Sequence, residues 1–190
     1  MRRRYSVRSV DAHGDQLTLW VTTGHSGIGA SWVESLKLRD EVELIGPRGK
    51  IGLDPVADWH LFVGDASGFG AFYRMAESIE PPGQAIFVVE LETMDDAVTP
   101  RLDADISPTA IFVERAGRAP GDPSGLLSAL ALLELPVGDG HAYLFGELAT
   151  VRVVREALCD RGLDGGQIEM KAFWRAGVGN LDHGEPPKSD

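Results

Sequence analysis

Two glycine-rich stretches in this sequence have the residue types and spacing that suit the binding of an anion. Gly24-His25-Ser26-Gly27-Ile28-Gly29 and Gly64-Asp65-Ala66-Ser67-Gly68-Phe69-Gly70 each come directly before a segment with helical spacing of apolar residues. Glycine lets the backbone approach a ligand closely, and the first N–H groups of a helix lack partners within it. Such donors bind phosphate, so both stretches are candidate nucleotide sites. The second pattern also fits an ordinary strand-to-helix turn.

A third candidate is Arg3-Arg4-Tyr5-Ser6, which presents a cation, an aromatic face and a hydroxyl group. Residues 4–10 are rich in β-formers, so these side chains are predicted to lie on a strand. Gly146-Glu147 is a fourth candidate, because it follows a predicted strand directly. Arg3 and Arg4 also fit a solvated basic terminus, and Tyr5 also fits an ordinary strand tyrosine.

The composition excludes several classes of protein. The 190 residues carry a formal net charge of -11, with 29 acidic against 18 basic residues, so nucleic acid and anionic membranes are poor partners. A single cysteine, Cys159, excludes a disulfide within the chain and a thiolate metal site. No His, Asp and Glu set has metal-ligand spacing, and no apolar run reaches the about 20 residues of a membrane span. No apolar stretch follows the N-terminal arginines, so a secretory signal is not predicted and the cytoplasm is the expected compartment.

The first part of the chain, residues 1–54, is predicted to be antiparallel β structure with one small helix. Residues 4–10 and 16–23 read as two strands joined by a turn at residues 11–15, which predicts a hairpin. The glycine-rich loop at residues 24–29 leads into a short helix at residues 30–38, and residues 40–45 read as a further strand. A boundary is expected at residues 54–58, where the pattern changes.

The second part, residues 55–180, is predicted to be a parallel α/β sheet with helices on both faces. Its elements alternate along the chain, and residues 181–190 are a polar, proline-containing tail predicted to be disordered. The predicted strands are residues 60–63, 85–91, 109–114, 141–145 and 167–173, and the predicted helices are residues 71–79, 123–133 and 147–161. In open sheets of this kind, ligands bind at the carboxyl ends of the strands, where the 64–70 loop and Gly146-Glu147 lie.

Four segments, in this order, resemble the siderophore-interacting protein family, which are FAD-dependent ferric-siderophore reductases of the ferredoxin-reductase type. The segments are Arg3-Arg4-Tyr5-Ser6, Gly29-Ala30-Ser31-Trp32, Leu61-Phe62-Val63-Gly64-Asp65, and the pair Phe145-Gly146-Glu147 with Lys171-Ala172-Phe173-Trp174-Arg175. The resemblance implies a partial flavin-binding β-barrel followed by a ferredoxin-reductase-like nucleotide-binding domain. It covers nearly the whole chain.

The resemblance also implies roles for individual residues. Tyr5 would stack on the flavin ring, Ser6 would hydrogen-bond near its redox-active nitrogen, and Arg3 would pair with the FAD pyrophosphate. The residues implied to cradle that pyrophosphate through backbone N–H groups are Gly29, Ala30 and Ser31. The residues implied to face the flavin and the nucleotide of the reductant are Gly64, Asp65, Ala66, Ser67, Gly146 and Glu147, with Trp174 at the flavin edge. Lys171 and Arg175 would attract an anionic ferric siderophore, since a chain of net charge -11 needs a local cationic patch. The flavin supplies the chemistry, so no catalytic acid or base is expected.

Two features depart from the family pattern. After Gly64-Asp65 the chain continues Ala66-Ser67-Gly68-Phe69-Gly70, where family members have Glu-Thr and then Leu-Pro-Ala or similar. Family members also carry several strands before the Arg-x-Tyr-Ser strand. We therefore expect this chain to lack the N-terminal strands of the barrel and to expose strand edges and an apolar face, which favours a homodimer.

Alternative interpretations remain open. Trp174 fits core packing as well as flavin contact, and Lys171 and Arg175 fit a solvated face. The chain could be a non-enzymatic nucleotide-binding or interaction domain, or a flavin reductase with another acceptor such as a quinone. The electron donor could be NADH, NADPH or a ferredoxin. Arg115 and Arg118 are candidates to bind the 2′-phosphate of NADPH.

Overall fold

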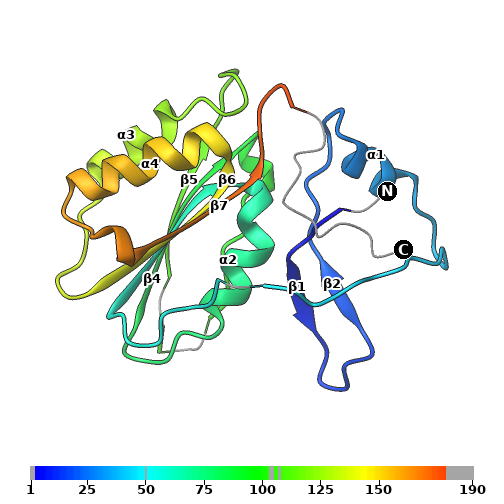
Figure 1. Cartoon of the computed structure of the whole chain (residues 1–190), viewed down its shortest axis with the longest axis horizontal. Helices are drawn as coiled ribbons and strands as arrows, with labels where there is room; N and C mark the ends of the chain where they lie inside the picture. Colours follow the sequence, from blue (N-terminus) through cyan, green and yellow to red (C-terminus); the bar gives the residue numbers. More distant parts are fainter. Residues whose placement is uncertain (1–2, 50, 103–104, 107, 179–190) are drawn as a thin grey trace, which may run out of the picture.

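The computed structural model describes residues 3–49, 51–102, 105–106 and 108–178. Its first part is a hairpin and a helix (Figure 1). Strand β1 (Val7–Val10) pairs antiparallel with β2 (Leu17–Leu19), and helix α1 (Ile28–Ser35) follows the glycine-rich loop. The predicted hairpin is therefore confirmed, with shorter strands than expected. Tyr5 and Ser6, predicted to lie on the first strand, instead come just before β1.

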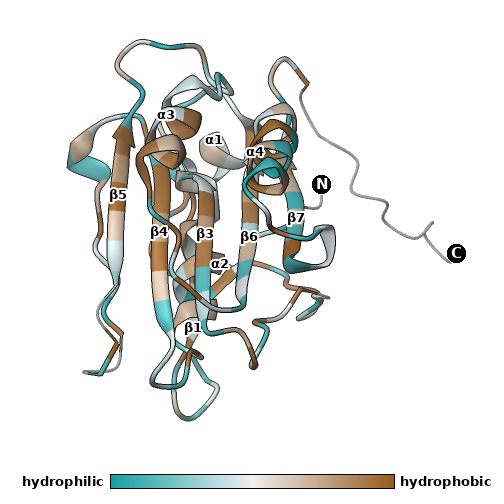
Figure 2. Cartoon of the chain, turned by 90° about the vertical axis from the view of Figure 1, so that its left-hand side faces the viewer, coloured by the Kyte–Doolittle hydropathy of each residue, from teal (hydrophilic) through white to brown (hydrophobic). Residues whose placement is uncertain are grey.

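The second part is a five-stranded sheet in which every neighbouring pair of strands is parallel. The strands are β3 (Trp59–Asp65), β4 (Gln84–Leu91), β5 (Thr109–Glu114), β6 (Gly140–Glu147) and β7 (Ile168–Trp174). Their order across the sheet is β5-β4-β3-β6-β7. The three central strands are buried on both faces and consist mostly of apolar residues (Figure 2), which is why they form the interior of a parallel sheet.

Helices cover both faces of this sheet (Figure 1). Helix α2 (Phe69–Ala76) packs on one face, where aromatic residues such as Phe62, Phe72 and Phe87 form the core. Helices α3 (Ser124–Leu132) and α4 (Leu148–Asp160) pack on the other face over Leu, Ile and Val side chains. Three short 3-10 helices complete the elements: η1 (Ala66–Gly68), η2 (Met94–Asp96) and η3 (Gly165–Gln167). The predicted α/β arrangement is confirmed.

The hairpin attaches to the second part through α2. Arg8 on β1 forms an ion pair of 2.7 Å with Glu77, and its guanidinium lies 5.0 Å from the ring centre of Trp20. Trp20 in turn meets the edge of Tyr73 on α2, with ring centres 5.5 Å apart. The two parts lie in close contact at Gly70, where a Cβ would be in ordinary van der Waals contact, 3.7 Å from both the Ser6 carbonyl oxygen and the Trp20 Cβ.

Two sequence predictions are wrong. Residues 40–45, predicted as a strand, form no strand, and Val42, Leu44 and Ile45 are exposed. Their alternating apolar pattern finds neither a neighbouring strand nor a packing surface among the described residues. In addition, Gly64 and Asp65 belong to β3 and α2 begins at Phe69, so the predicted loop at residues 64–70 is reduced to the turn η1. The predicted disordered tail, residues 181–190, lies outside the described residues.

No helix in the described part of the chain is both long enough and apolar enough to cross a membrane.

Candidate functional site

The strand order creates a crevice between β3 and β6. From β3 the chain proceeds outward to β4 and β5 on one side, and it then returns to place β6 and β7 on the other side. Neighbouring loops therefore leave the carboxyl ends of β3 and β6 in opposite directions. Ligands of open α/β sheets bind at such a point. The residues at this point are Gly64, Asp65, Gly146 and Glu147, which were predicted from two segments far apart in the sequence.

Both glycines at the crevice are required by close contacts. A Cβ at Gly64 would overlap the carbonyl oxygen of Phe145 on the neighbouring strand. Gly146 has φ +152°, and a Cβ there would lie 2.5 Å from Oδ2 of Asp65. Gly146 thereby leaves room on β6 for the Asp65 side chain, which reaches across that strand to β7.

The Asp65 carboxylate connects four segments through hydrogen bonds. Its Oδ1 accepts from the Ser67 backbone N–H at 2.9 Å and from the Ser67 hydroxyl at 2.5 Å. Its Oδ2 accepts from the Glu147 N–H at 3.0 Å and from the Trp174 indole N–H at 2.8 Å. Asp65 and Ser67 thus use these groups internally, and their effect is to fix the shape of the crevice. The predicted residues Asp65, Ser67, Glu147 and Trp174 are brought together.

Glu147 is also used structurally. Its Oε2 accepts from the Thr150 N–H at 2.8 Å and so caps the start of α4, while its Oε1 accepts from the Ala176 N–H at 3.2 Å. The Thr150 hydroxyl donates to the Gly121 carbonyl oxygen at 2.8 Å. The loop after β5 is therefore held beside the carboxyl end of β6. Ala66 lies half-buried in η1 beside these residues.

A group of charged side chains lies at the carboxyl ends of β4 and β5. Glu90 is buried, with 5% of its side chain exposed, and it pairs with Arg115 Nε at 3.1 Å and Arg118 Nη2 at 3.3 Å. Arg115 Nη1 also pairs with Glu92. Both arginines were candidates to bind a 2′-phosphate, whereas their pairing with Glu90 was not predicted. The available signal was a glutamate near the end of a strand that is otherwise apolar.

At the N-terminal site, Tyr5 lies against the start of α1. Its ring stacks on Trp32, with centres 6.0 Å apart, and a Cβ at Gly29 would lie 2.7 Å from its Oη. Among the described residues, this buried Oη has no hydrogen-bond partner. Burial raises the pKa of Tyr5 above its ordinary value, and the charge of Arg3 opposes this in part, so the phenol keeps its proton. The structure therefore places an unpartnered hydroxyl beside a helix N-terminus.

These features fit a flavin nucleotide in part. The Gly27 N-cap of α1 has no side-chain cap, so the first N–H groups of the helix, at Ile28, Gly29 and Ala30, remain for a ligand phosphate. The Ser31 N–H already donates to the Gly27 carbonyl oxygen at 3.0 Å, so this residue could offer only its exposed side chain. Ala30 is buried, and Arg3 and Ser6 are half-buried nearby in the chain.

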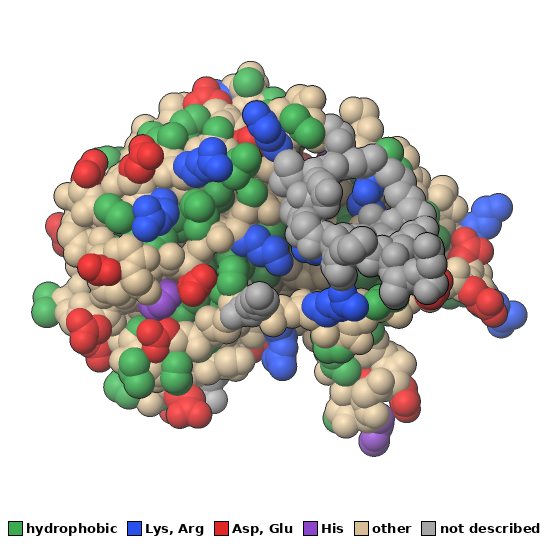
Figure 3. Space-filling view, viewed as in Figure 1, with side chains coloured by type: hydrophobic (Ala, Val, Ile, Leu, Met, Phe, Trp, Pro, Cys, Tyr) green, Lys and Arg blue, Asp and Glu red, His purple; other side chains and the backbone are tan. Residues whose placement is uncertain are grey.

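The two predicted substrate cations lie at the edge strand β7 and just after it. Lys171 is exposed, and its Nζ lies 5.8 Å from the ring centre of Phe173. Arg175 is exposed and forms a β-bridge with Val178 immediately after β7. Figure 3 shows Lys and Arg side chains across the middle of one face, over α4, β7 and the junction of the two parts of the chain.

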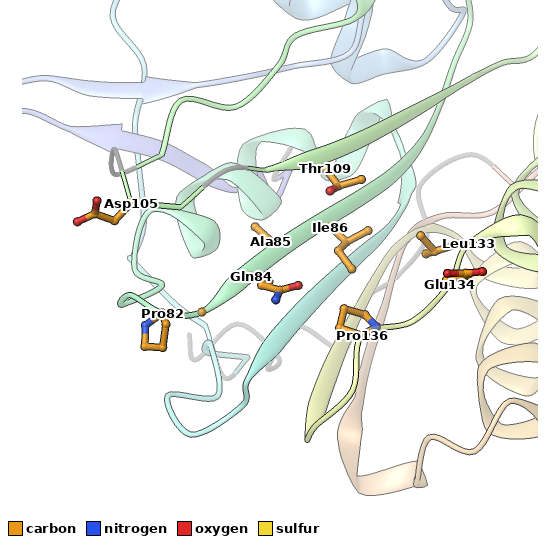
Figure 4. A pocket seen from close by; sticks show the side chains of 10 residues that line it. Pro82, Gln84, Ala85, Ile86, Asp105, Thr109, Leu133, Glu134 and Pro136 are labelled. Atoms are coloured by element: carbon orange, nitrogen blue, oxygen red, sulfur yellow. The ribbon is translucent and has the colours of Figure 1, made fainter.

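Two cavities lie at the opposite, amino ends of the strands. The larger, of about 450 Å³, is lined by the starts of β4 and β5 and by the segment after α3, including Gln84, Thr109 and Glu134 (Figure 4). The smaller, of about 310 Å³, is lined by Asp54 and His141 among others. Within the described residues, no three His, Cys, Asp or Glu side chains gather as a metal site. Neither cavity belongs to the crevice, which is shaped by backbone turns and by bonded side chains.

Comparison with known proteins agrees with this geometry. A sequence model of the siderophore-interacting protein family matches residues 57–177. The Mycobacterium tuberculosis protein Rv2895c is 28% identical over 189 residues, which cover 92% of this chain and 65% of that protein. The ferric vibriobactin reductase ViuB of Vibrio cholerae is 28% identical over 162 residues, covering 82% of this chain and 57% of ViuB. The chain thus spans less than two thirds of the length of these relatives.

Solved structures show the same arrangement. A siderophore utilization protein from T. fusca superposes with a TM-score of 0.82 at 31% identity, over 95% of this chain and 69% of that one. Phthalate dioxygenase reductase has a TM-score of 0.61 at 18% identity, over 91% of this chain and 54% of that one, and it shows the shared ferredoxin-reductase-like fold alone. The family match covers more than half of the sequence, and the fold agrees with it. This chain belongs to the siderophore-interacting protein family.

Proposed function

We propose that this chain carries the flavin and reductant sites of an FAD-dependent reductase that passes electrons from a nicotinamide nucleotide or a ferredoxin-type donor to a ferric siderophore. The observation that carries the proposal is the buried Tyr5 hydroxyl, unpartnered among the described residues, beside Gly29 at the start of α1. Membership of the family and the likeness to the ferric vibriobactin reductase ViuB also support a reductase. Bound FAD would accept two electrons as hydride and release them singly to two ferric ions, which leave as ferrous iron.

The residues of this chain would bind and orient the reactants. Tyr5 and Ser6 would contact the flavin ring, while Arg3 and the N–H groups of Gly29 and Ala30 would bind the pyrophosphate. Ser31 would contribute its hydroxyl, because its N–H is used within α1. In the crevice, the residues that would face the reductant are Gly64, Asp65, Ala66, Ser67, Gly146, Glu147 and Trp174.

The ferric siderophore would be attracted by Lys171 and Arg175. Both side chains are exposed, at the edge strand β7 or just beyond it, next to Trp174. Catecholate and carboxylate complexes of ferric iron are anionic, and the chain as a whole, with a net charge of -11, repels them. Two local cations at the edge of the crevice would therefore raise the concentration of such a substrate where electrons are delivered.

Titration of the purified protein with FAD tests the flavin site. We expect the visible absorption of bound flavin and quenching of Trp32 fluorescence as FAD saturates the site. Gly29→Val should weaken FAD binding at least about tenfold, because its side chain displaces Tyr5 and covers the first N–H groups of α1. Gly52→Ala is the matched control, since a Cβ there meets nothing within 4 Å.

The same titration separates the alternatives. A protein that binds no FAD at saturating concentration would be a nucleotide-binding or interaction domain without this chemistry. If FAD binds, reduction of a ferric catecholate by NADH or NADPH is followed with a ferrous chelator dye. Reduction of quinone or free flavin in place of the ferric complex would identify a flavin reductase with another acceptor.

A further inference from the structure

The charged group at the carboxyl ends of β4 and β5 lies where a dinucleotide site reads the ribose of the adenosine. In such sites the glycine-containing turn follows the first strand, and the residue that contacts the ribose 2′ position ends the neighbouring second strand. Here β3 carries the turn, and β4 is its neighbour with Asp65 directly paired to Glu90. Glu92 follows immediately after β4, and Arg115 follows β5.

The two arginines are already engaged by carboxylates. Glu90 accepts from Arg115 Nε at 3.1 Å and from Arg118 Nη2 at 3.3 Å, and Arg118 Nη2 also donates to the Glu114 carbonyl oxygen at 2.9 Å. Arg115 Nη1 pairs with Glu92. Arg118 Nε has no partner among the described residues, but it is enclosed, so a ligand reaches it only if Arg118 leaves Glu90.

The balance of charge disfavours an added phosphate. Glu90, Glu92, Arg115 and Arg118 sum to no net charge, and a 2′-phosphate would bring about -2 against a buried carboxylate that holds the same donors. Separating a guanidinium from Glu90 would leave that carboxylate buried without its partner, which is costly. A 2′-hydroxyl group requires only an accessible acceptor, and the Glu92 side chain is 65% exposed.

We propose that this end of the sheet selects NADH over NADPH, with Glu92 accepting a hydrogen bond from the adenosine ribose and Glu90 acting as a positioning residue for Arg115 and Arg118. The inference rests on the proposed function, because it concerns the reductant of that same reaction. The nucleotide would be recognised by its free ribose hydroxyl groups, and Arg115 and Arg118 would pair with carboxylates of the protein and not with a phosphate.

Binding of NAD⁺ and NADP⁺ to the FAD-loaded protein tests the inference by calorimetry, without turnover. We expect the wild type to bind NAD⁺ at least about tenfold more tightly than NADP⁺. Glu92→Arg should lower the preference for NAD⁺ over NADP⁺ at least about tenfold. The change should come mainly from tighter binding of NADP⁺, because the substitution removes the acceptor and adds a cation. Asp95→Asn, which removes a nearby charge in η2, is the control and should leave the ratio unchanged.

The outcomes distinguish this inference from the proposed function. Equal or tighter binding of NADP⁺ by the wild type, or an unchanged ratio in Glu92→Arg, overturns the NADH assignment while the reductase proposal stands. Failure of both nucleotides to bind overturns the inference together with the nicotinamide half of the proposed function. FAD binding, measured separately, then shows whether the flavin half survives.

Discussion

At the scale of single residues, Asp65 shows how one polar side chain can shape the crevice through hydrogen bonds to other parts of the chain. Its two oxygens accept from Ser67, Glu147 and Trp174, which come from η1, the end of β6 and the end of β7. Hydrogen bonds to an ionised acceptor are stronger than neutral ones and leave little freedom in the groups that donate. The indole of Trp174 is therefore held in one orientation at the crevice.

His60 is a buried titratable group away from the crevice, and it predicts an acid-dependent loss of stability. Burial and, to a lesser extent, the neighbouring His141 lower the pKa of His60, while Asp54 opposes the shift, and together they take this pKa from 6.5 to about 4. Between pH 6.5 and 4, His60 binds a proton in the unfolded chain but not in the folded protein. Stability is therefore complete above pH 6.5 and should fall, by up to about 3 kcal/mol, as the pH drops towards 4.

Urea unfolding at several pH values measures this loss. His60→Phe keeps an aromatic ring beside Tyr143 but cannot take up a proton, so its free energy of unfolding should vary less between pH 6.5 and 4. His13→Gln, in the exposed turn of the hairpin, should keep the slope of the wild type. An unchanged slope in His60→Phe would assign the acid sensitivity to other groups.

The sequence predicted that the residues of the crevice lie at the carboxyl ends of two strands, although it placed them just beyond the strands, and it did not predict what they contact. The predicted positions Gly64, Asp65, Gly146 and Glu147 do meet, because parallel strands place their carboxyl ends along one edge. The contact of Asp65 with Trp174 depends on the missing side chain at Gly146 and on a register shift between β6 and β7. Buried Glu90 pairs with two arginines, Arg115 and Arg118, which follow the next strand, β5. Sequence spacing carries no information about such contacts between distant segments.

At the scale of elements, the parallel sheet was predictable and residues 40–45 were not. Runs such as Gln84–Leu91 are apolar almost throughout, which only a strand buried on both faces explains. The alternation at residues 40–45 predicts a strand only if another strand is available to pair with it. No described strand pairs with that segment, and Leu44 and Ile45 are 63% and 56% exposed.

The contact between the hairpin and α2 predicts a local effect of removing Arg8. Its guanidinium pairs with Glu77 at 2.7 Å and lies 5.0 Å from the ring centre of Trp20, and the Arg8 and Glu77 side chains are both partly buried. Arg8→Gln should lower the free energy of unfolding by about 1–2 kcal/mol, because a cation–π contact and a partly buried ion pair are lost together. Amide hydrogen exchange in β1 and β2 should accelerate more than exchange in β3.

Arg74 supplies the matched control for this prediction. It reaches the same Glu77 at 3.5 Å, but 57% of its side chain is exposed, and surface pairs of this kind contribute about 0–1 kcal/mol. Arg74→Gln should therefore leave exchange in the hairpin unchanged. Equal effects of the two substitutions would show that Arg8 acts only as a surface charge.

At the scale of the whole molecule, the proposed flavin site and the proposed reductant site belong to different parts of the chain. Tyr5 and Gly29 belong to the first part, while Asp65 and Gly146 belong to the sheet. The connection between the parts runs through Asp54, which is bonded to β6. Its N–H donates to the Tyr143 hydroxyl oxygen at 2.7 Å, and its Oδ2 lies 3.2 Å from His141 Nδ1. These contacts fix where the connecting segment leaves the sheet.

Tyr143→Phe is expected to loosen this connection while the sheet remains intact. The ring is fully buried, and burial raises the pKa of Tyr143 to about 12, so the neutral hydroxyl accepts from Asp54 at any working pH. Removing it leaves the Asp54 N–H without its acceptor and should cost about 1 kcal/mol. Hydrogen exchange at Asp54 and protease cleavage in residues 51–58 should both accelerate.

Tyr73→Phe separates this effect from a general loss of stability. Tyr73, on α2, is also a buried tyrosine, and its hydroxyl donates to the Val98 carbonyl oxygen. The Tyr73→Phe substitution therefore removes one hydrogen bond as well. Both variants should lose similar stability, but only Tyr143→Phe should expose the connecting segment, because the hydroxyl of Tyr143 accepts the hydrogen bond from Asp54, whereas that of Tyr73 donates to Val98. FAD binding should survive in Tyr143→Phe, since Tyr5 and α1 do not contact Tyr143 through any described ring contact or hydrogen bond. Equal cleavage of residues 51–58 in the two variants would mean that Asp54 does not determine the joint between the parts.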